Sequence, residues 1–228
     1  MADSRRNRAL VVYKKTVGRR FRLGFGAETA GSSIATWSSP EAQVVRATLR
    51  PGTAEPTLLF QGGELMPSTG AVVVSDTLYL YATRPKFLEN SVFVARVPLA
   101  RALNHEAWRY YSGNGLWTAD AKQATEVMEA SPHLSVHWNA YLRKYVAISN
   151  VTLNYGIELR TAPRPEGPWS APEMVARGVA APRSDLCNWA ALGHPELARE
   201  GGRVLYVSYR HPTGDFNHEI RLMEITLR

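Results

Sequence analysis

The side chains of this sequence that could do acid–base chemistry are a few carboxylates and histidines lying between apolar runs. Asp185 and Glu64 are the leading carboxylates, because each precedes an apolar run and has few charged neighbours. Two carboxyl groups roughly 5 to 9.5 Å apart can supply the proton donor and the nucleophile or base that cleave a glycosidic bond. We therefore expect Asp185 and Glu64 to be catalytic, with a solvated loop acid as the competing interpretation of each.

Histidine and amide side chains near these carboxylates could bind a polar ligand. His194 is the main example, because Pro195 restricts the backbone and Glu196, two residues on, would share its face of a strand and could orient the imidazole. A buried structural histidine is the alternative. The expected substrate-binding residues are His137, Asn139, Asn154, Tyr155, Asn188, His194, Glu196 and Asp215.

Repeated strands are expected to position these side chains. Four runs rich in aliphatic and tyrosine residues begin at Leu10, Leu78, Tyr145 and Leu205, spaced 68, 67 and 60 residues apart, and a second strand-like run follows each. Three of the four are preceded by a further strand candidate, at 69–75, 134–138 and 193–197. A fourth strand is expected at 108–111 and at 173–176, whereas helical signals are confined to 99–108 and 119–130. Four antiparallel strands per ~60 residues are typical of a β-propeller blade.

In a propeller, the connections that lead into the innermost strands and those that join second to third strands lie at one face, around a central channel. Most of the candidate residues fall on such connections. His133 and His137 would share one face of a strand, but a metal ion usually takes three or more ligands, so we expect no metal site. We expect no cofactor, and leave open a cation in the channel.

Charge and composition limit the partners. The 228 residues are 45% hydrophobic and 21% charged, as in an ordinary globular protein, and the single cysteine excludes an internal disulfide. Residues 1–22 carry eight basic side chains against one acidic, which accounts for the whole formal net charge of +7. We therefore expect a basic arm at 1–8, a single domain at 9–228, no nucleic-acid partner and no membrane partner.

Several motifs resemble one protein family. They are Ala95-Arg96-Val97-Pro98, Trp108-Arg109-Tyr110-Tyr111-Ser112-Gly113, Ser135-Val136-His137-Trp138-Asn139, Leu159-Arg160-Thr161-Ala162 with Gly167-Pro168-Trp169-Ser170, and His194-Pro195-Glu196-Leu197. In this order they resemble a bacterial five-bladed β-propeller family long labelled domain of unknown function 4185, which includes endo-D-arabinanases. The resemblance implies an all-β propeller of the five-bladed glycosidase type, here with about three full blades and one partial blade.

The resemblance also implies a function. We expect a carbohydrate-active, glycoside hydrolase-like protein that binds or cleaves a furanoside or arabinan-type polysaccharide. The alternative is a non-catalytic interaction or assembly module, because the family's first blade has no counterpart in this chain, and that leaves open whether the chain is an enzyme. We further expect self-association through exposed blade edges. The family suggests a secreted or cell-surface location, although no signal peptide is recognised here.

Overall fold

The computed structural model of the chain describes residues 2–3, 8–21, 24–37, 49–67, 69–87, 90–151, 155–183, 187–214 and 217–228. The chain divides into two compact units. The first unit holds residues 1–68, 72–82 and 93–125, and the second holds residues 69–71, 83–92 and 126–228. Strands β5, β6 and β7 contribute residues to both units.

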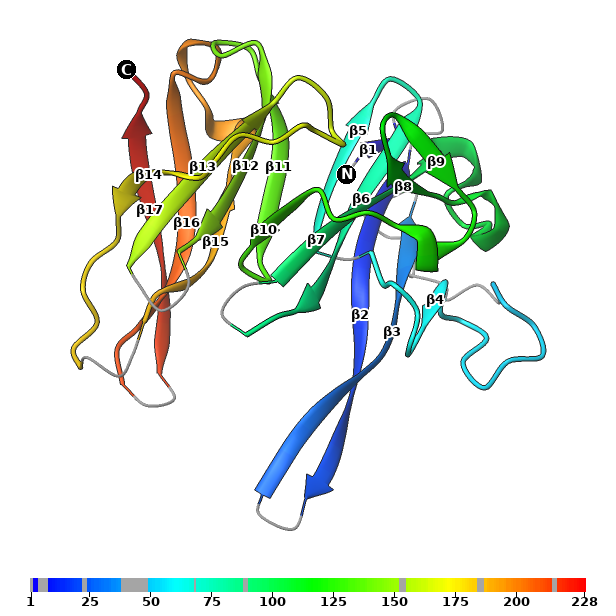
Figure 1. The fold of residues 1–228 in the computed structure, drawn as a ribbon. Helices are drawn as coiled ribbons and strands as arrows, with labels where there is room; N and C mark the ends of the chain where they lie inside the picture. The colour runs from blue at the N-terminus through cyan, green and yellow to red at the C-terminus, as the bar shows by residue number, and fades with distance from the viewer. Residues whose placement is uncertain are drawn as a thin grey trace. The chain divides into compact units, whose positions relative to one another are not determined.

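Antiparallel strands that follow one another in sequence form four sheets (Figure 1). The first contains β1 (Ala2–Asp3), β2 (Arg8–Phe21), β3 (Gly24–Trp37) and β4 (Phe60–Gln61). The second contains β5 (Gly70–Val74), β6 (Thr77–Pro85), β7 (Asn90–Pro98), β8 (Arg109–Gly113), β9 (Leu116–Thr118) and β10 (Met128–Ala130). The third contains β11 (Leu134–Asn139), β12 (Lys144–Asn150), β13 (Gly156–Ala162) and β14 (Glu173–Arg177). The fourth contains β15 (Trp189–Gly193), β16 (Val204–Pro212) and β17 (His218–Thr226).

In the described part of the chain, helical structure is limited to short 3₁₀ turns, so the expected all-β fold is confirmed. These turns are η2 (Leu99–Arg101), η3 (His105–Ala107), η4 (Ala121–Gln123), η5 (Pro195–Leu197) and η6 (Glu200–Gly202). Neither helix candidate of the sequence is an α-helix: the segment 99–108 contains the two turns η2 and η3, and the segment 119–130 contains η4 and strand β10. Within the described ranges, no helix has the length and apolar character that crossing a membrane requires.

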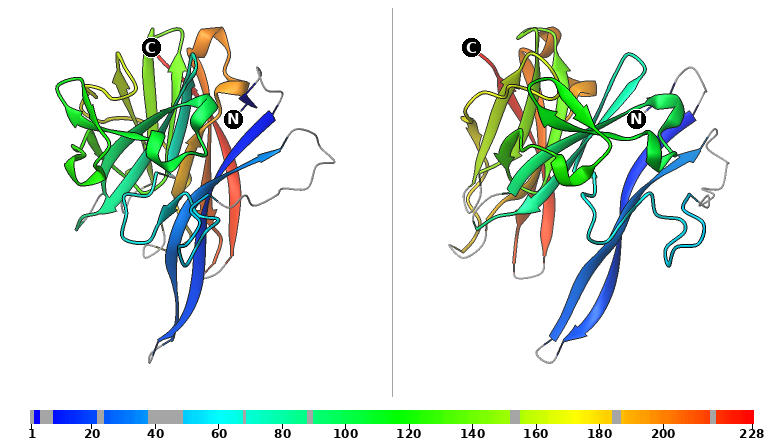
Figure 2. Two further views of the ribbon diagram at one scale, coloured as in Figure 1. Left: turned by 90° about the vertical axis from the view of Figure 1, so that its right-hand side faces the viewer. Right: turned by 45° about the vertical axis from the view of Figure 1, so that its right-hand side comes forward.

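Two strand assignments from the sequence are wrong in detail. The innermost strand expected at 193–197 begins four residues earlier and ends at Gly193, and η5 follows it because Pro195 has no N–H to donate to a ladder. The short strands expected near Leu10 and Trp37 extend into one long hairpin, β2–β3, paired from Ala9↔Trp37 to Phe21↔Gly24 (Figure 2). Ala2 and Asp3 of the expected basic arm pair with Ala9 and Arg8.

The core of the second unit lies between the third and fourth sheets. One face of β12 and β13 packs on one face of β15, β16 and β17 through a cluster of buried aliphatic side chains and one tyrosine. Side chains alternate across a strand, so the next residue along each strand of the fourth sheet points away from this core. The cluster consists of Val146, Ile148, Ile157, Leu159, Ala191, Leu205, Val207, Tyr209 and Ile225.

The strand registers give this unit two ends. At the first end, strands β12 and β16 end and strands β13, β15 and β17 begin. This end contains Asn150, Asn188 and His218, and we call it the bulge end. Asn139 and His194 lie toward the other, where β11 ends and β16 begins, and we call it the turn end. A hydrogen bond joins the two sheets at each end: Asn150 bonds to Ala191 at the bulge end, and Asn139 bonds to Gly202 at the turn end.

Candidate functional site

A strained β-bulge marks the bulge end. The pairing of β15 with β16 shifts register between Trp189 and Leu192. Ala190, inside this bulge, has a φ of 56°, a left-handed conformation that a residue with a Cβ rarely adopts. Bulges and such strained residues are enriched next to functional sites, where they redirect a side chain or stop the pairing of strands. This bulge therefore identifies the bulge end as a candidate binding site.

The side chain of Asn150 fixes the backbone of the bulge, and its amide nitrogen is a donor that no described residue accepts from. Its Oδ1 accepts a hydrogen bond of 2.6 Å from the Ala191 N–H, which fixes the orientation of the amide. Asn150 is 4% exposed, and within the described part of the chain its Nδ2 has no hydrogen-bond partner. A buried donor without an acceptor costs about 1–3 kcal/mol, so in native structures a water molecule, an ion or a ligand pairs such a group where no protein acceptor is in reach. A ligand oxygen would satisfy it.

Asn188, by contrast, supports the site. Its Nδ2 donates to the Val179 carbonyl at 2.9 Å, and its Oδ1 lies 3.0 Å from Nδ1 of His211. The Tyr209 hydroxyl accepts from the Val179 N–H at 3.2 Å. Because the amide of Asn188 is occupied on both sides, it fixes the segment leading into β15.

Trp189 was not singled out from the sequence, although it directly follows Asn188. Its ring makes edge contacts with His133 and His218 at centroid distances of 5.5 and 6.1 Å, and the Arg210 guanidinium lies 4.4 Å from its centroid. The indole is 37% exposed. These contacts hold an aromatic ring rigidly at the edge of the site.

Three expected site residues, Asp185, Asn154 and Asp215, lie outside the described residues. The described residues on either side of them belong to the bulge end: Val151 and Tyr155, Arg183 and Cys187, and Gly214 and Asn217. Tyr155 is described, and its carbonyl accepts from the Gly178 N–H at 2.7 Å. Of the expected site residues that the structure describes, Tyr155 and Asn188 therefore belong to segments of this end.

The other expected residues of this unit lie toward the turn end. Both ring nitrogens of His194 are hydrogen-bonded. Nδ1 lies 2.8 Å from Oε1 of Glu196, and Nε2 lies 2.7 Å from Oγ of Ser208. Hydrogen bonds from its own backbone and from His194 hold the pKa of Glu196 below its usual range. Asn139 bridges Gly202 and Leu142 at 2.8 and 2.9 Å. The structure therefore does not bring this group together with the residues of the bulge end.

His137 is a buried imidazole without partners. It is 8% exposed, and neither ring nitrogen has a hydrogen-bond partner among the described residues. A Cβ on Gly193 would lie 3.1 Å from its Cε1, so the ring packs directly against the backbone of β15. Burial lowers its pKa to about 4, opposed in part by the carboxylate of Glu196. His137 is therefore neutral in the folded protein near pH 7.

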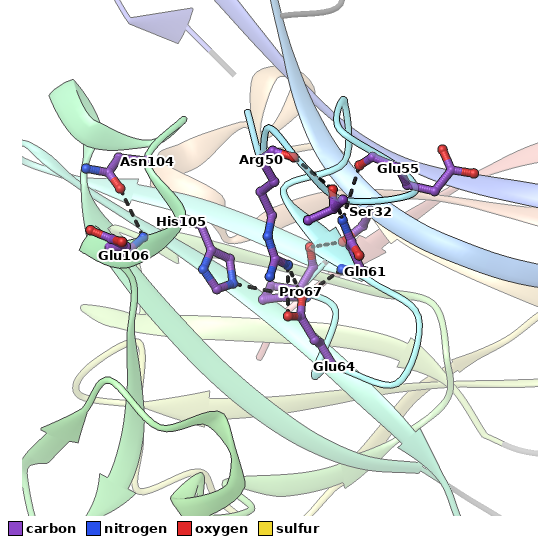
Figure 3. Close-up of polar contacts among 10 residues, drawn as sticks. Ser32, Arg50, Glu55, Gln61, Glu64, Pro67, Asn104, His105 and Glu106 are labelled. Atoms are coloured by element: carbon purple, nitrogen blue, oxygen red, sulfur yellow. Dashed lines mark hydrogen bonds and ion pairs between the residues drawn. The ribbon is translucent and has the colours of Figure 1, made fainter. Parts of the chain in front are cut away.

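Glu64 belongs to the first unit and is held as an ion pair (Figure 3). Arg50 Nη1 donates to both of its oxygens at 2.8 and 2.9 Å, and the Gln61 N–H donates at 2.7 Å. His105 Nε2 lies 3.9 Å away, with its pKa lowered by burial and by Arg50. An arginine contact stabilises a charged carboxylate, so these contacts suit a nucleophile or base better than a proton donor.

Tyr110 lies near enough to the Arg50–Glu64 ion pair for both charges to act on its pKa. Burial raises the pKa of Tyr110 well above its usual range, and Glu64 adds to the effect while Arg50 opposes it. The phenol therefore stays protonated. Within the ranges that the structure describes, no group of three or more His, Cys, Asp and Glu side chains is placed to hold a metal ion.

Successive antiparallel sheets, each built from strands adjacent in sequence, define an all-β protein of the β-propeller type. Within this class, the chain belongs to the family described as Domain of unknown function (DUF4185), whose profile matches residues 28–223. The resemblance seen in the motifs is thereby confirmed. No curated protein sequence matches the chain.

Solved structures are similar to the chain to different degrees. The chain is similar to a putative hydrolase from Bacteroides ovatus, at 16% identity and a TM-score of 0.59, over 90% of this chain and 56% of that one. A thermostable family-43 glycoside hydrolase matches at 14% identity and a TM-score of 0.49, over 92% and 66% of the two chains. A GH43 β-xylosidase/α-arabinofuranosidase from a compost microbial metagenome, in complex with xylotriose, matches at 11% and 0.39, over 97% and 91%. The chain spans about half the length of the Bacteroides ovatus protein.

Proposed function

We propose that the chain is a carbohydrate-active protein of the glycoside hydrolase type that binds a furanoside or arabinan-type polysaccharide at the bulge end. The observation that carries this proposal is the unpaired Asn150 Nδ2 donor beside the strained Ala190. Sugar hydroxyls are both donors and acceptors, so a hydroxyl oxygen is a natural partner for such an amide. Family membership and the resemblance to endo-D-arabinanases support the proposal.

The contacts of each residue indicate the role that we propose for it. Asn150 and Tyr155 bind sugar hydroxyls, while Asn188 holds the segment that leads to Trp189. Asp185 remains the proposed proton donor and Glu64 the proposed nucleophile or base.

Reducing-end release from arabinan separates the proposed function from its alternative. An enzyme releases reducing ends, and Asp185→Asn abolishes the release. A non-catalytic binding module retains the polysaccharide in affinity electrophoresis and releases none. A chain that neither retains nor cleaves arabinan or related furanoside polymers contradicts both forms of the proposal.

The variant Asn150→Asp is expected to weaken saccharide binding roughly tenfold or more, because it removes one donor and leaves the acceptor for Ala191 in place. Isothermal titration with an arabinan oligosaccharide measures the change. Circular dichroism at the titration temperature checks that the variant is folded.

The matched control is Asn139→Asp at the turn end. Both asparagines are buried, at 4% and 1% exposure, so both variants bury a carboxylate and lose stability. Asn139→Asp also loses the donor to the Gly202 carbonyl, so it is expected to be the less stable of the two. It should nevertheless bind saccharide as the unmodified chain does. Equal losses of affinity in both variants would refute a specific role for Asn150.

A further inference from the structure

Ser208, His194 and Glu196 form a hydrogen-bonded chain on the fourth sheet that the proposed function does not use. Nε2 of His194 lies 2.7 Å from Oγ of Ser208, and Nδ1 lies 2.8 Å from Oε1 of Glu196. A hydroxyl, an imidazole and a carboxylate joined in this order are the groups that activate a serine nucleophile. Such a triad is recognised by its geometry, because the order of its residues in the sequence varies between unrelated folds.

Two adjacent strands hold the three side chains in place. Ser208 lies in the middle of β16 and follows the core residue Val207, so its side chain points away from the core. His194 directly follows β15, and its N–H donates to the Tyr206 carbonyl at 2.8 Å. Glu196 belongs to η5, and this turn brings its carboxylate back to the imidazole.

The charge on Glu196 determines which nitrogen of His194 carries the proton. Hydrogen bonds from its own backbone and from His194 hold the pKa of Glu196 below its usual range, so near pH 7 this carboxylate is ionised and can only accept. Nδ1 of the neutral imidazole is therefore the N–H donor, and Nε2 is the acceptor. The Ser208 hydroxyl then donates to Nε2, which is the direction in which an attacking serine loses its proton.

The three side chains are accessible to a substrate. The side chains of His194 and Glu196 are 30% and 64% exposed, and Ser208 is partly buried. Ser208 is paired in register with Leu192 of β15 and Leu222 of β17, which are 38% and 56% exposed. The hydroxyl therefore lies between two apolar side chains at the surface, and a shallow surrounding of this kind suits a short acyl group.

Arg210 places a positive charge on the other side of Ser208 from His194. It follows Ser208 by two positions, so its side chain leaves the same side of β16. Its guanidinium lies 4.4 Å from the ring centroid of Trp189, and no carboxylate contacts it among the described residues. A charged donor at this position can stabilise the negative oxygen that forms when a serine attacks a carbonyl carbon.

We propose that Ser208, His194 and Glu196 form a serine-hydrolase site that cleaves carboxylic esters of short acyl groups. Oγ of Ser208 attacks the carbonyl carbon while Nε2 of His194 takes the hydroxyl proton. The bond to the alcohol oxygen then breaks, and His194 gives this proton to the leaving alkoxide. Water attacks the acyl-serine with His194 again as the base, which releases the carboxylic acid and restores the hydroxyl. Glu196 is a positioning residue, and the proposal is independent of the proposed function.

Labelling of the unmodified protein with a fluorophosphonate tests the nucleophile. The reagent bonds to the oxygen of an activated serine and releases hydrogen fluoride, so the intact mass should rise by one label and peptide mapping should place it on Ser208. Ser208→Ala should take up no label. The control Ser112→Ala, at a partly buried serine of β8, should be labelled as the unmodified chain is. No label, or a label on another serine, would overturn the proposal.

Hydrolysis of p-nitrophenyl acetate tests the roles of the three residues. Ser208→Ala and His194→Gln should each lower kcat/KM by about 100-fold or more. Glu196→Gln should lower kcat by about tenfold or more and leave KM unchanged, because it loses the charge that orients the imidazole and touches no substrate. Circular dichroism checks that each variant is folded. Unchanged hydrolysis by folded Ser208→Ala, or a change in KM alone for Glu196→Gln, would show that the three residues have only a structural role.

Discussion

Acidification from pH 7 to pH 4 is expected to destabilise the protein through His137. Its imidazole is buried and unpartnered among the described residues, and burial lowers its pKa from the ordinary 6.5 to about 4. The unfolded chain therefore takes up a proton at a higher pH than the folded chain does. The stabilising contribution is complete above pH 6.5 and is lost as the pH falls toward 4.

The loss amounts to about 3 kcal/mol, since each pH unit between the two pKa values is worth about 1.4 kcal/mol. Urea unfolding at several pH values measures it. His105 contributes in the same direction, because burial and Arg50 lower its pKa as well.

The variant His137→Leu separates the two histidines. It removes two buried nitrogens that have no partner, so stability at pH 7 should be unchanged or higher. The loss of stability on acidification should shrink to what the other groups contribute. If the variant lost as much stability between pH 6.5 and pH 4 as the unmodified protein, burial of a neutral His137 could not explain the acid sensitivity.

Trp108→Ala is expected to lower the free energy of unfolding by about 3–5 kcal/mol, the range for emptying a large aromatic site in a core. The side chain is 1% exposed and packs edge-on against Phe60 at 5.2 Å. Its Nε1 donates to the Ala102 carbonyl at 3.1 Å, so the variant also leaves a buried acceptor unpaired. The midpoint of urea unfolding gives the change.

Trp117→Ala is the control for that experiment. Trp117 is only half-buried, and it packs against Tyr79 and Tyr111 beneath the Arg96 guanidinium. Truncating it should cost about 1–2 kcal/mol, since less apolar surface returns to water. Equal losses at the two positions would show that Trp108 does not occupy a sealed core.

The strands that sequence reasoning located best are those that are buried or partly buried over most of their length. The runs beginning at Leu78, Tyr145 and Leu205 all lie within observed strands, β6, β12 and β16, because burial requires a continuous apolar pattern. The β2–β3 hairpin was underestimated for the opposite reason. It continues through residues such as Val17, which is 43% exposed, so no buried face imposes a pattern on its outer part.

The candidate site was harder to predict because it depends on contacts distant in sequence. Asn150 bonds to Ala191, 41 residues away in sequence. No local pattern indicates that its Nδ2 has no hydrogen-bond partner among the described residues. The bulge at Ala190 gave no signal either, since alanine is not a residue that marks left-handed backbone. Glu64 looked isolated in sequence, and only folding brings Arg50 to it across 14 residues.

The measurement that tests saccharide binding at the bulge end most directly is an NMR titration of the unmodified protein with an arabinan oligosaccharide. The account predicts saturable shifts of the Ala191 backbone amide and of the Asn150 side-chain amide, which share one hydrogen bond. It also predicts that the amides of Leu142 and Gly202 at the turn end do not move. Shifts confined to the turn end, or no shifts at saturating saccharide, would contradict it.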